Sequence, residues 1–81
     1  MEAKSLREHR TSWLLTIRGL AEEAGISPTT LMHIEAGRRV PHPSTMVRIA
    51  AVLEVRVVEV EEFVRAMRVH QQSKAKKGAR S

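Results

Sequence analysis

Apolar residues recur at helical spacing in five stretches of this chain, and residues that start or stop helices separate the stretches. The spacing predicts helices over residues 5–13, 17–24, 28–36, 43–53 and 57–70. Ser5 has Glu8 three residues later, in the spacing of a capping box, although the first helix begins earlier if Ser5 lies inside it. The fourth helix begins near Pro43 or Ser44. An all-α fold follows.

The second and third helices have the clearest boundaries. Gly25 and Gly37 follow their last apolar positions, and glycine readily takes the positive φ found at helix C-termini. Ser27 is a good N-cap, and Pro28 fits the first helical position without losing a needed N–H group. Residues 38–43 contain two prolines, which exclude a regular helix, so we expect a loop there.

The segment after residue 54 carries two competing patterns. Valines at positions 55, 57, 58 and 60 alternate with charged residues, as in a β-strand. Val60, Phe63, Val64 and Met67 also stand at i, i+3, i+4 and i+7, and this spacing favours a helix over residues 57–70. From residue 71 onward large apolar residues are absent, which predicts a disordered tail.

Charge divides the chain at the same point. The 81 residues carry a formal net charge of +5. Four of the 14 Lys and Arg residues lie at positions 71–81 without any acid, so the first 70 residues hold ten basic against all nine acidic residues. We therefore expect one near-neutral domain over residues 1–70 and a basic tail over 71–81. Net charge alone is weak evidence for nucleic-acid binding.

Composition also restricts the chemistry. The chain has no cysteine, which excludes disulfides, thiolate metal sites and cysteine nucleophiles. The histidines, at positions 9, 33, 42 and 70, include no pair at i, i+3 or i, i+4, so we expect no metal site. No pattern places a nucleophile, a base and an orienting group together, so we expect neither catalytic residues nor a cofactor. Without a leader or a bilayer-length apolar run, we expect a cytoplasmic protein.

The helices at 17–24 and 28–36 are joined by only three residues. Apolar residues line their facing sides and the corner between them: Leu20, Ala21, Ile26, Leu31 and Ile34. The small Ala21 permits close approach of the two backbones, and so short a connection makes the helices cross steeply. This is the geometry of a helix-turn-helix, whose second helix enters the DNA major groove.

At these positions the sequence resembles the Cro and phage-repressor (xenobiotic-response-element) family of helix-turn-helix domains. The matching positions are Leu6, Arg10, Leu15-Thr16, Leu20-Ala21-Glu22, Gly25-Ile26-Ser27, Thr30-Leu31, Ile34-Glu35, Gly37-Arg38-Arg39, Pro41, Thr45-Met46, Arg48-Ile49-Ala50, Leu53, Val55, Glu59 and Val60. The resemblance covers roughly residues 5–64 without gaps. It implies a compact five-helix, lambda-repressor-like domain.

The resemblance implies roles for particular residues. Contacts to base edges fall to Pro28, Thr29, Thr30, Met32 and His33. Contacts to phosphates fall to Thr16, Arg18, Ser27, Arg38 and Arg39. A structural ion pair between Arg10 and Glu35 is expected to tie the first helix to the third.

Several positions depart from the family pattern. Leu14 and Glu54 stand where glycine is common, and Ile17 stands where many members carry a glutamine that anchors phosphate. Pro28 and Thr29 stand where Gln, Arg or Asn are common. These departures favour modest direct base readout, with more dependence on DNA shape, backbone contacts or a partner.

The resemblance thus implies a transcriptional regulator, a repressor, that binds specific double-stranded DNA as a homodimer, with a regulatory protein as a further partner. Two other interpretations stay open. The chain could be a protein-interaction adaptor, such as an antitoxin-like or polymerase-associated subunit, that keeps the fold without base readout. It could also bind nucleic acid non-specifically through its basic tail. Trp13 is either packed under the last helix or an anchor at an interface.

Overall fold

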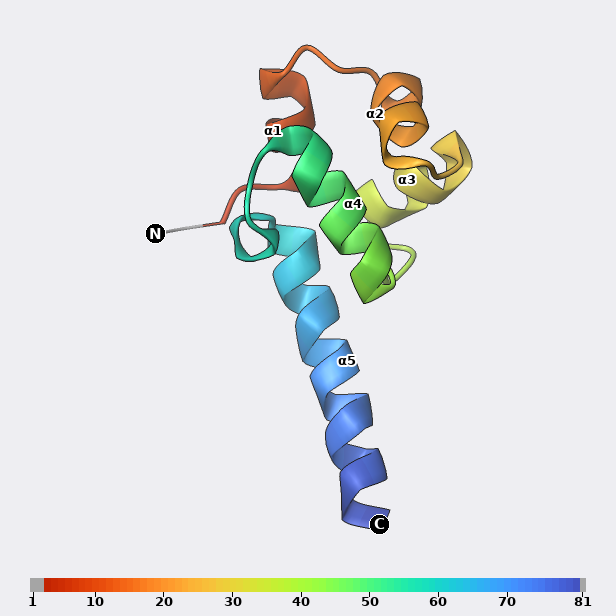
Figure 1. Cartoon of the computed structure of the whole chain (residues 1–81), viewed down its shortest axis with the longest axis vertical. Coiled ribbons are helices and arrows are strands. Elements are labelled where there is room, and N and C mark those ends of the chain that lie inside the picture. Colours follow the sequence, from red (N-terminus) through yellow and green to blue (C-terminus); the bar gives the residue numbers. More distant parts are fainter. Residues whose placement is uncertain (1–2, 81) are drawn as a thin grey trace.

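The computed structural model describes residues 3–80, with side chains as far as Gln71, and this part of the chain is all-helical (Figure 1). The helices are α1 (Leu6–Ser12), α2 (Ile17–Ala24), α3 (Pro28–Glu35), α4 (Pro43–Leu53), the single 3₁₀ turn η1 (Val57–Glu59) and α5 (Glu61–Arg80). The all-α fold with five α-helices is therefore confirmed for the described residues. None of these helices is both long and apolar enough to span a bilayer.

Side-chain caps fix the starts of the helices. Ser5 and Glu8 form the predicted capping box: the Glu8 N–H donates to Ser5 Oγ at 3.1 Å, and the Ser5 N–H donates to Glu8 Oε1 at 3.2 Å. The backbone N–H and the hydroxyl of Ser5 hold the pKa of the Glu8 carboxyl below its ordinary value of 4.5. Thr16 and Ser27 cap α2 and α3 through their hydroxyl oxygens.

The core is built almost entirely from aliphatic side chains. Its fully buried members are Leu6, Leu20, Ala21, Ala24, Leu31, Ile34, Met46, Ile49, Ala50, Leu53, Val60, Phe63 and Ala66. They come from all five helices and from Val60, just before α5, and α2 packs against both α3 and α4. Figure 1 shows α4 crossing the molecule with α2 and α3 on one side of it in the view and α1 on the other.

Four helices end in the same way. Each has a residue with positive φ at its C-cap or directly after it: Leu14 at 59°, Gly25 at 74°, Gly37 at 75° and Glu54 at 56°. At each end the next residue donates its N–H to the carbonyl five positions earlier, as Leu15 does to Arg10 at 3.2 Å. Leu14 and Glu54 adopt a conformation that costs a residue with a Cβ about 1–2 kcal/mol. These are the two positions where the resemblance expects glycine.

The segment that begins at residue 57 differs from the prediction at its start. The predicted helix over 57–70 begins only at Glu61, because η1 is a single 3₁₀ turn and Val60 is extended, in a β-bridge with Lys4. The Lys4 N–H donates to the Glu59 carbonyl at 3.1 Å, and the Glu61 N–H donates to the Lys4 carbonyl at 2.8 Å. The β-branched run thus keeps part of its preference for extended backbone.

The α5 helix continues to Arg80, and because side chains are described only as far as Gln71, the predicted disordered tail from residue 71 stays a prediction. Residues 71–80 contain no proline and are rich in Gln, Ala, Lys and Arg, all of which favour a helix once one has begun. The absence of large apolar residues excludes a core contact but does not stop a helix. The contribution of the tail's basic side chains to binding lies outside the described residues.

Candidate nucleic-acid interface

The turn between α2 and α3 is held by backbone hydrogen bonds at both ends. At the end of α2, the Ile26 N–H donates to the Ala21 carbonyl at 2.9 Å, while Gly25 takes the left-handed conformation. At the start of α3, Ser27 Oγ accepts from the Thr30 N–H at 3.1 Å, and Pro28 occupies the first helical position. Ala21 is fully buried at the crossing. The direction in which α3 leaves the turn is therefore fixed.

Arg10 and Glu35 hold the far end of α3 against α1. Arg10 Nε lies 2.7 Å from Glu35 Oε2, and Nη2 donates to Oε1 at 3.2 Å, so the pair is bidentate. Arg10 Nη1 also donates to the Leu15 carbonyl at 2.8 Å. The two side chains are only 11% and 10% exposed. The resemblance implied this pairing, and the geometry adds that the same guanidinium also fixes the loop between α1 and α2.

The residues expected to contact bases lie on the outer side of α3 but differ in exposure. Pro28, Thr29 and Met32 are exposed, with Met32 at 53%, whereas Thr30 and His33 are half-buried. Thr30 Oγ1 accepts a hydrogen bond from Ser27 Oγ at 2.8 Å. The Ser27 hydroxyl is thus used within the cap, whereas Thr30 keeps its own hydroxyl proton.

Of the residues expected to contact phosphates, Ser27 lies in the turn, and the others lie at the two ends of the α2–α3 unit. Thr16 Oγ1 accepts from the Gly19 N–H at 2.9 Å, which leaves the hydroxyl proton available to an outside acceptor. Gly19 has no Cβ, and one placed there would lie 3.2 Å from that oxygen, tighter than usual contact. Arg18, near the start of α2, and Arg38 and Arg39, just beyond α3, are exposed.

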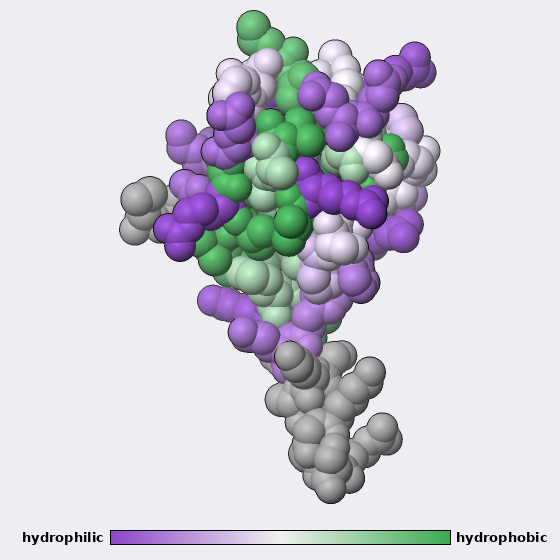
Figure 2. All heavy atoms as spheres, in the orientation of Figure 1, coloured by the Kyte–Doolittle hydropathy of each residue, from purple (hydrophilic) through white to green (hydrophobic). Residues whose placement is uncertain are grey.

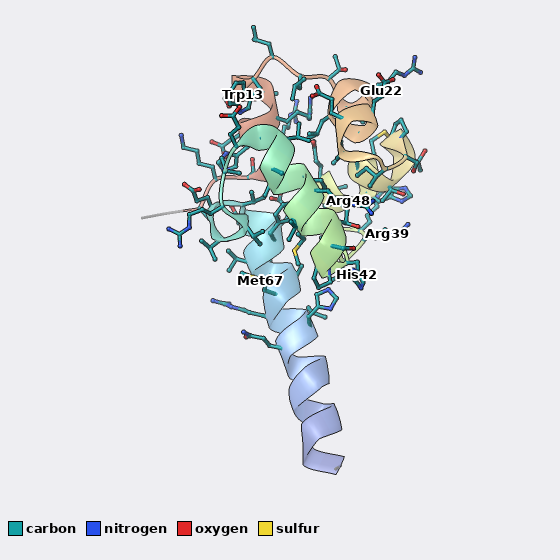
Figure 3. All side chains as sticks on the ribbon, in the orientation of Figure 1. Trp13, Glu22, Arg39, His42, Arg48 and Met67 are labelled. Carbon is teal, nitrogen blue, oxygen red and sulfur yellow. The ribbon has the colours of Figure 1, made fainter. Side chains whose placement is uncertain are left out.

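Arg48 is an exposed cation that the sequence did not single out for binding. It lies on α4, and Figure 3 draws it with Arg39 on the side of α4 that faces α3 in the view. The only signal in the sequence was that Arg48 stands next to the apolar positions of α4, which is equally typical of a plain solvent-facing residue. Exposed arginines therefore lie on α4 as well as on α2 and in the loop after α3.

The helix-turn-helix carries three carboxylates, those of Glu22, Glu23 and Glu35. Glu35 is paired with Arg10. Glu22 and Glu23 are exposed on α2, and Figure 3 places Glu22 beside the end of α2 that is remote from α4 in the view. No residue of α3 apart from Glu35 carries a fixed charge. The outer side of α3 is therefore uncharged, while exposed arginines stand on α2, on α4 and in the loop after α3.

Trp13 contacts the end of α4, whereas one of its two predicted placements was packing under the last helix. Its indole Nε1–H donates to the Leu53 carbonyl at 2.9 Å, at the C-terminus of α4 and not under the last helix. The ring remains 49% exposed, and the neighbouring Leu14 is 92% exposed. The two side chains form an apolar projection at the α1–α2 loop, and Figure 3 shows Trp13 on the opposite side of the view from α3.

Three of the four histidines have hydrogen-bond partners within the domain. His9 Nε2–H donates to the Glu59 carbonyl at 2.7 Å, and His70 Nε2–H donates to the Pro41 carbonyl at 2.9 Å. His42 caps α4, since its Nδ1 accepts from the Ser44 N–H at 3.1 Å. Among the residues with described side chains, no three His, Cys, Asp or Glu residues are placed to hold a metal ion.

Comparison with known proteins agrees with this geometry. A family model described as a helix-turn-helix domain matches residues 2–63. The uncharacterized HTH-type transcriptional regulator RghRB of Bacillus subtilis (strain 168) is 45% identical over 53 residues, which are 64% of this chain and 38% of that protein. The chain thus spans less than half of this relative's length, and no solved structure matches it significantly. Because the matched region runs from before α1 into α5, the chain belongs to the helix-turn-helix domain family, of the Cro and phage-repressor type that its sequence resembles.

Proposed function

We propose that this protein is a sequence-specific, double-stranded DNA-binding transcriptional regulator that inserts the outer side of α3 into the major groove. One observation carries the proposal. The α3 helix is fixed at its start by the Ser27 cap and at its end by the Arg10–Glu35 pair, yet its outer side is exposed and uncharged. A helix held rigidly while its outer side stays free is what major-groove entry requires.

The charges around α3 suit a duplex. Arg18 precedes the helix-turn-helix corner, and Arg38, Arg39 and Arg48 follow α3, so phosphates on both sides of the groove meet cations. The Thr16 hydroxyl and the N–H groups at the two helix starts add neutral donors. Four of the domain's exposed cations would therefore lie along the backbone of bound DNA, while other exposed cations, such as Arg7, Arg56 and Arg65, lie elsewhere.

The functional unit is proposed to be a homodimer. One such module buries only about 600–1,000 Å² on DNA, too little for tight binding, so two copies on a pseudo-palindromic operator with half-sites about 34–36 Å apart supply the rest. A groove between α4 and α5 offers a surface for the second copy. It is lined almost wholly by apolar groups of Pro43, Met46, Val47, Val57, Met67, His70 and Gln71, and Figure 2 shows apolar side chains gathered over this region.

A dimer on its operator regulates by occupancy, and the proposed outcome is repression by steric exclusion of polymerase.

Val47 lies in the groove between α4 and α5 and is 60% exposed, so Val47→Glu tests directly whether this groove is the dimer interface. This variant is expected to fold and to sediment as a monomer, because a carboxylate would be buried in an apolar interface. If Val47→Glu still dimerises, the groove between α4 and α5 is not the dimer interface.

The DNA proposal is tested by selecting bound sites from a random duplex pool and measuring the affinity of variants for the enriched site. Thr29→Ala is expected to change the sequence preference, with unchanged thermal unfolding because the side chain is exposed. Thr11→Ala on α1 is the matched control, since Thr11 is equally exposed and should not affect binding. A pool without an enriched site refutes the proposal.

A second candidate function rests on the projection formed by Trp13 and Leu14. Leu14 is 92% exposed and has φ 59°, so its side chain contributes little to the core. An exposed apolar side chain of this kind is suited to contact with another protein. Under this hypothesis the protein is an adaptor. Leu14→Gly would then abolish partner capture, whereas operator selection would fail for the unaltered protein.

A further inference from the structure

The outer side of α3 has an unusual chemical composition for a surface that contacts bases. Its exposed side chains are Pro28, Thr29, Met32 and Ala36, the last at the C-cap. They offer methyl and methylene groups and a single free hydroxyl. Of the other polar side chains of α3, Thr30 accepts a hydrogen bond from Ser27 Oγ and keeps only its own proton to donate, and Glu35 is paired with Arg10. His33 is half-buried.

This composition restricts which base edges α3 can recognise. Bidentate recognition of guanine in the major groove needs Arg or Lys, and bidentate recognition of adenine needs Asn or Gln. None of these four residue types occurs in α3. Thymine is different, because its C5-methyl group projects into the major groove and is recognised by apolar contact. The surface of α3 is therefore complementary to a methyl group and poorly suited to the hydrogen-bonding edges of purines.

Resting on the proposed function, we propose that α3 reads the C5-methyl groups of pyrimidines in its half-site, through the γ-methyl of Thr29 and the side chain of Met32. Thymine and 5-methylcytosine both carry this group. The two residues stand three positions apart, about 4.5 Å along a helix axis, against about 3.4 Å between stacked base pairs. They thus suit methyl groups on neighbouring base pairs of a short thymine run.

The size of the effect follows from the transfer of one methyl group out of water. Each methyl read by α3 should tighten Kd about fourfold, which corresponds to about 0.8 kcal/mol. In a homodimer each half-site contributes its own methyl groups, so the factors multiply. This is smaller than the discrimination of a bidentate contact and agrees with the modest direct readout expected from Pro28 and Thr29.

The DNA side of the test replaces thymine by deoxyuracil in the operator obtained from the random pool. Deoxyuracil removes only the methyl group and keeps every hydrogen-bonding atom of the edge. Each replacement under α3 should weaken binding about fourfold, and a replacement in the flanking sequence should have no effect. A second arm places 5-methylcytosine or cytosine, paired with guanine, at the same position. If the methyl is the recognised group, 5-methylcytosine binds about fourfold more tightly than cytosine.

The protein side uses two near-isosteric variants. Thr29→Ser removes the γ-methyl and keeps the hydroxyl, so it should weaken binding to the thymine operator and abolish the deoxyuracil penalty at that base. Thr29→Val keeps the methyl and removes the hydroxyl, so it should retain the penalty. Both variants are expected to unfold at the same temperature as the unaltered protein, because Thr29 is exposed.

The outcomes separate this inference from the proposed function. An enriched operator whose affinity is unchanged by deoxyuracil, or one that requires unmethylated G·C pairs under α3, overturns methyl reading and leaves DNA binding intact. A pool with no enriched site overturns both. A deoxyuracil penalty that Thr29→Ser and Met32→Ala fail to change overturns the assignment to these two side chains.

Discussion

Two exposed regions of this small domain are supported in opposite ways. The α3 helix is capped by Ser27 and fixed by the bidentate Arg10–Glu35 pair. The α1–α2 loop carries Leu14 at φ 59°, in a conformation that disfavours any residue with a Cβ. Backbone hydrogen bonds to α1, the indole hydrogen bond of Trp13 and the contact of Arg10 with the Leu15 carbonyl hold it there. The exposed side chains of α3 are therefore held by an unstrained helix, whereas Leu14 in the loop is held in a conformation that lowers the stability of the fold.

The largest expected effect comes from removing the support of α3. Arg10→Ala leaves the Glu35 carboxylate buried without its partner, and the free energy of unfolding should fall by about 3–5 kcal/mol. Chemical denaturation measures this directly. Arg65→Ala is the matched control, because the Arg65–Glu61 pair is 63% and 55% exposed at 3.3 Å, and its loss should be nearly neutral. Equal losses for the two variants would show that the buried pair does not support α3.

The next effect concerns the arginines around α3. If Arg18, Arg38 and Arg39 each neutralise one phosphate in both halves of a dimer, the slope of log K against log salt is about −5. Affinity then falls about 10³-fold between 50 and 200 mM salt. Arg39→Ala should reduce the magnitude of the slope by about 2, and Arg68→Ala on α5 should leave it unchanged. A flat salt response in the unaltered protein contradicts these phosphate contacts.

Relieving strain in the loop should have a smaller, stabilising effect. Leu14→Gly is expected to raise the free energy of unfolding by about 0.5–1 kcal/mol, the left-handed penalty less the added entropy of glycine in the unfolded chain. Glu54→Gly tests the same point at the end of α4. Leu14→Ala separates strain from side-chain loss, since alanine keeps the Cβ and should give no gain. Thermal unfolding that is unchanged by both glycine variants would mean that these turns are not strained.

The smallest effect is at the capping box of α1, the helix that supplies Arg10. The Ser5 N–H and hydroxyl lower the pKa of Glu8, so the ionised carboxylate favours the folded state. This contribution is fully present above the ordinary value of 4.5 and is lost as pH falls through the lower folded value. In Glu8→Gln the corresponding part of the acid destabilisation should be missing when unfolding is followed between pH 6 and about pH 3. If both proteins show the same pH profile, the Glu8 carboxylate does not stabilise the helix start.

The sequence predicted the helix-turn-helix well because its boundaries are local signals. Ser27-Pro28, Gly25 and Gly37 act within one helical turn, and α2, α3 and α4 begin where expected. The start of α5 could not be predicted in this way, since it depends on the pairing of Val60 with Lys4 at the other end of the domain. The left-handed Leu14 and Glu54 were hidden because their residue types ordinarily avoid that conformation, and only the resemblance marked the two positions.

In the candidate site, too, local features could be predicted from the sequence and contacts between distant residues could not. The Arg10–Glu35 pair joins positions 25 residues apart, so spacing alone gave no reason to connect them, and the resemblance did. The helical period of α3 predicted an outward face, yet it could not show that Ser27 and Thr30 bond to each other. Arg48 was missed because a cation on a solvent-facing helix carries no pattern of its own.

The central claim is that the outer side of α3, and not the loop at Trp13 and Leu14, meets the DNA. Since the chain has no cysteine, Thr29→Cys provides a single attachment point for an iron chelate that cleaves nearby DNA. On the selected operator this variant should cut within the two half-sites, about one helical turn apart, whereas the same chelate on Leu14→Cys should give no localised cleavage. Localised cutting from residue 14 with none from residue 29 would contradict the account.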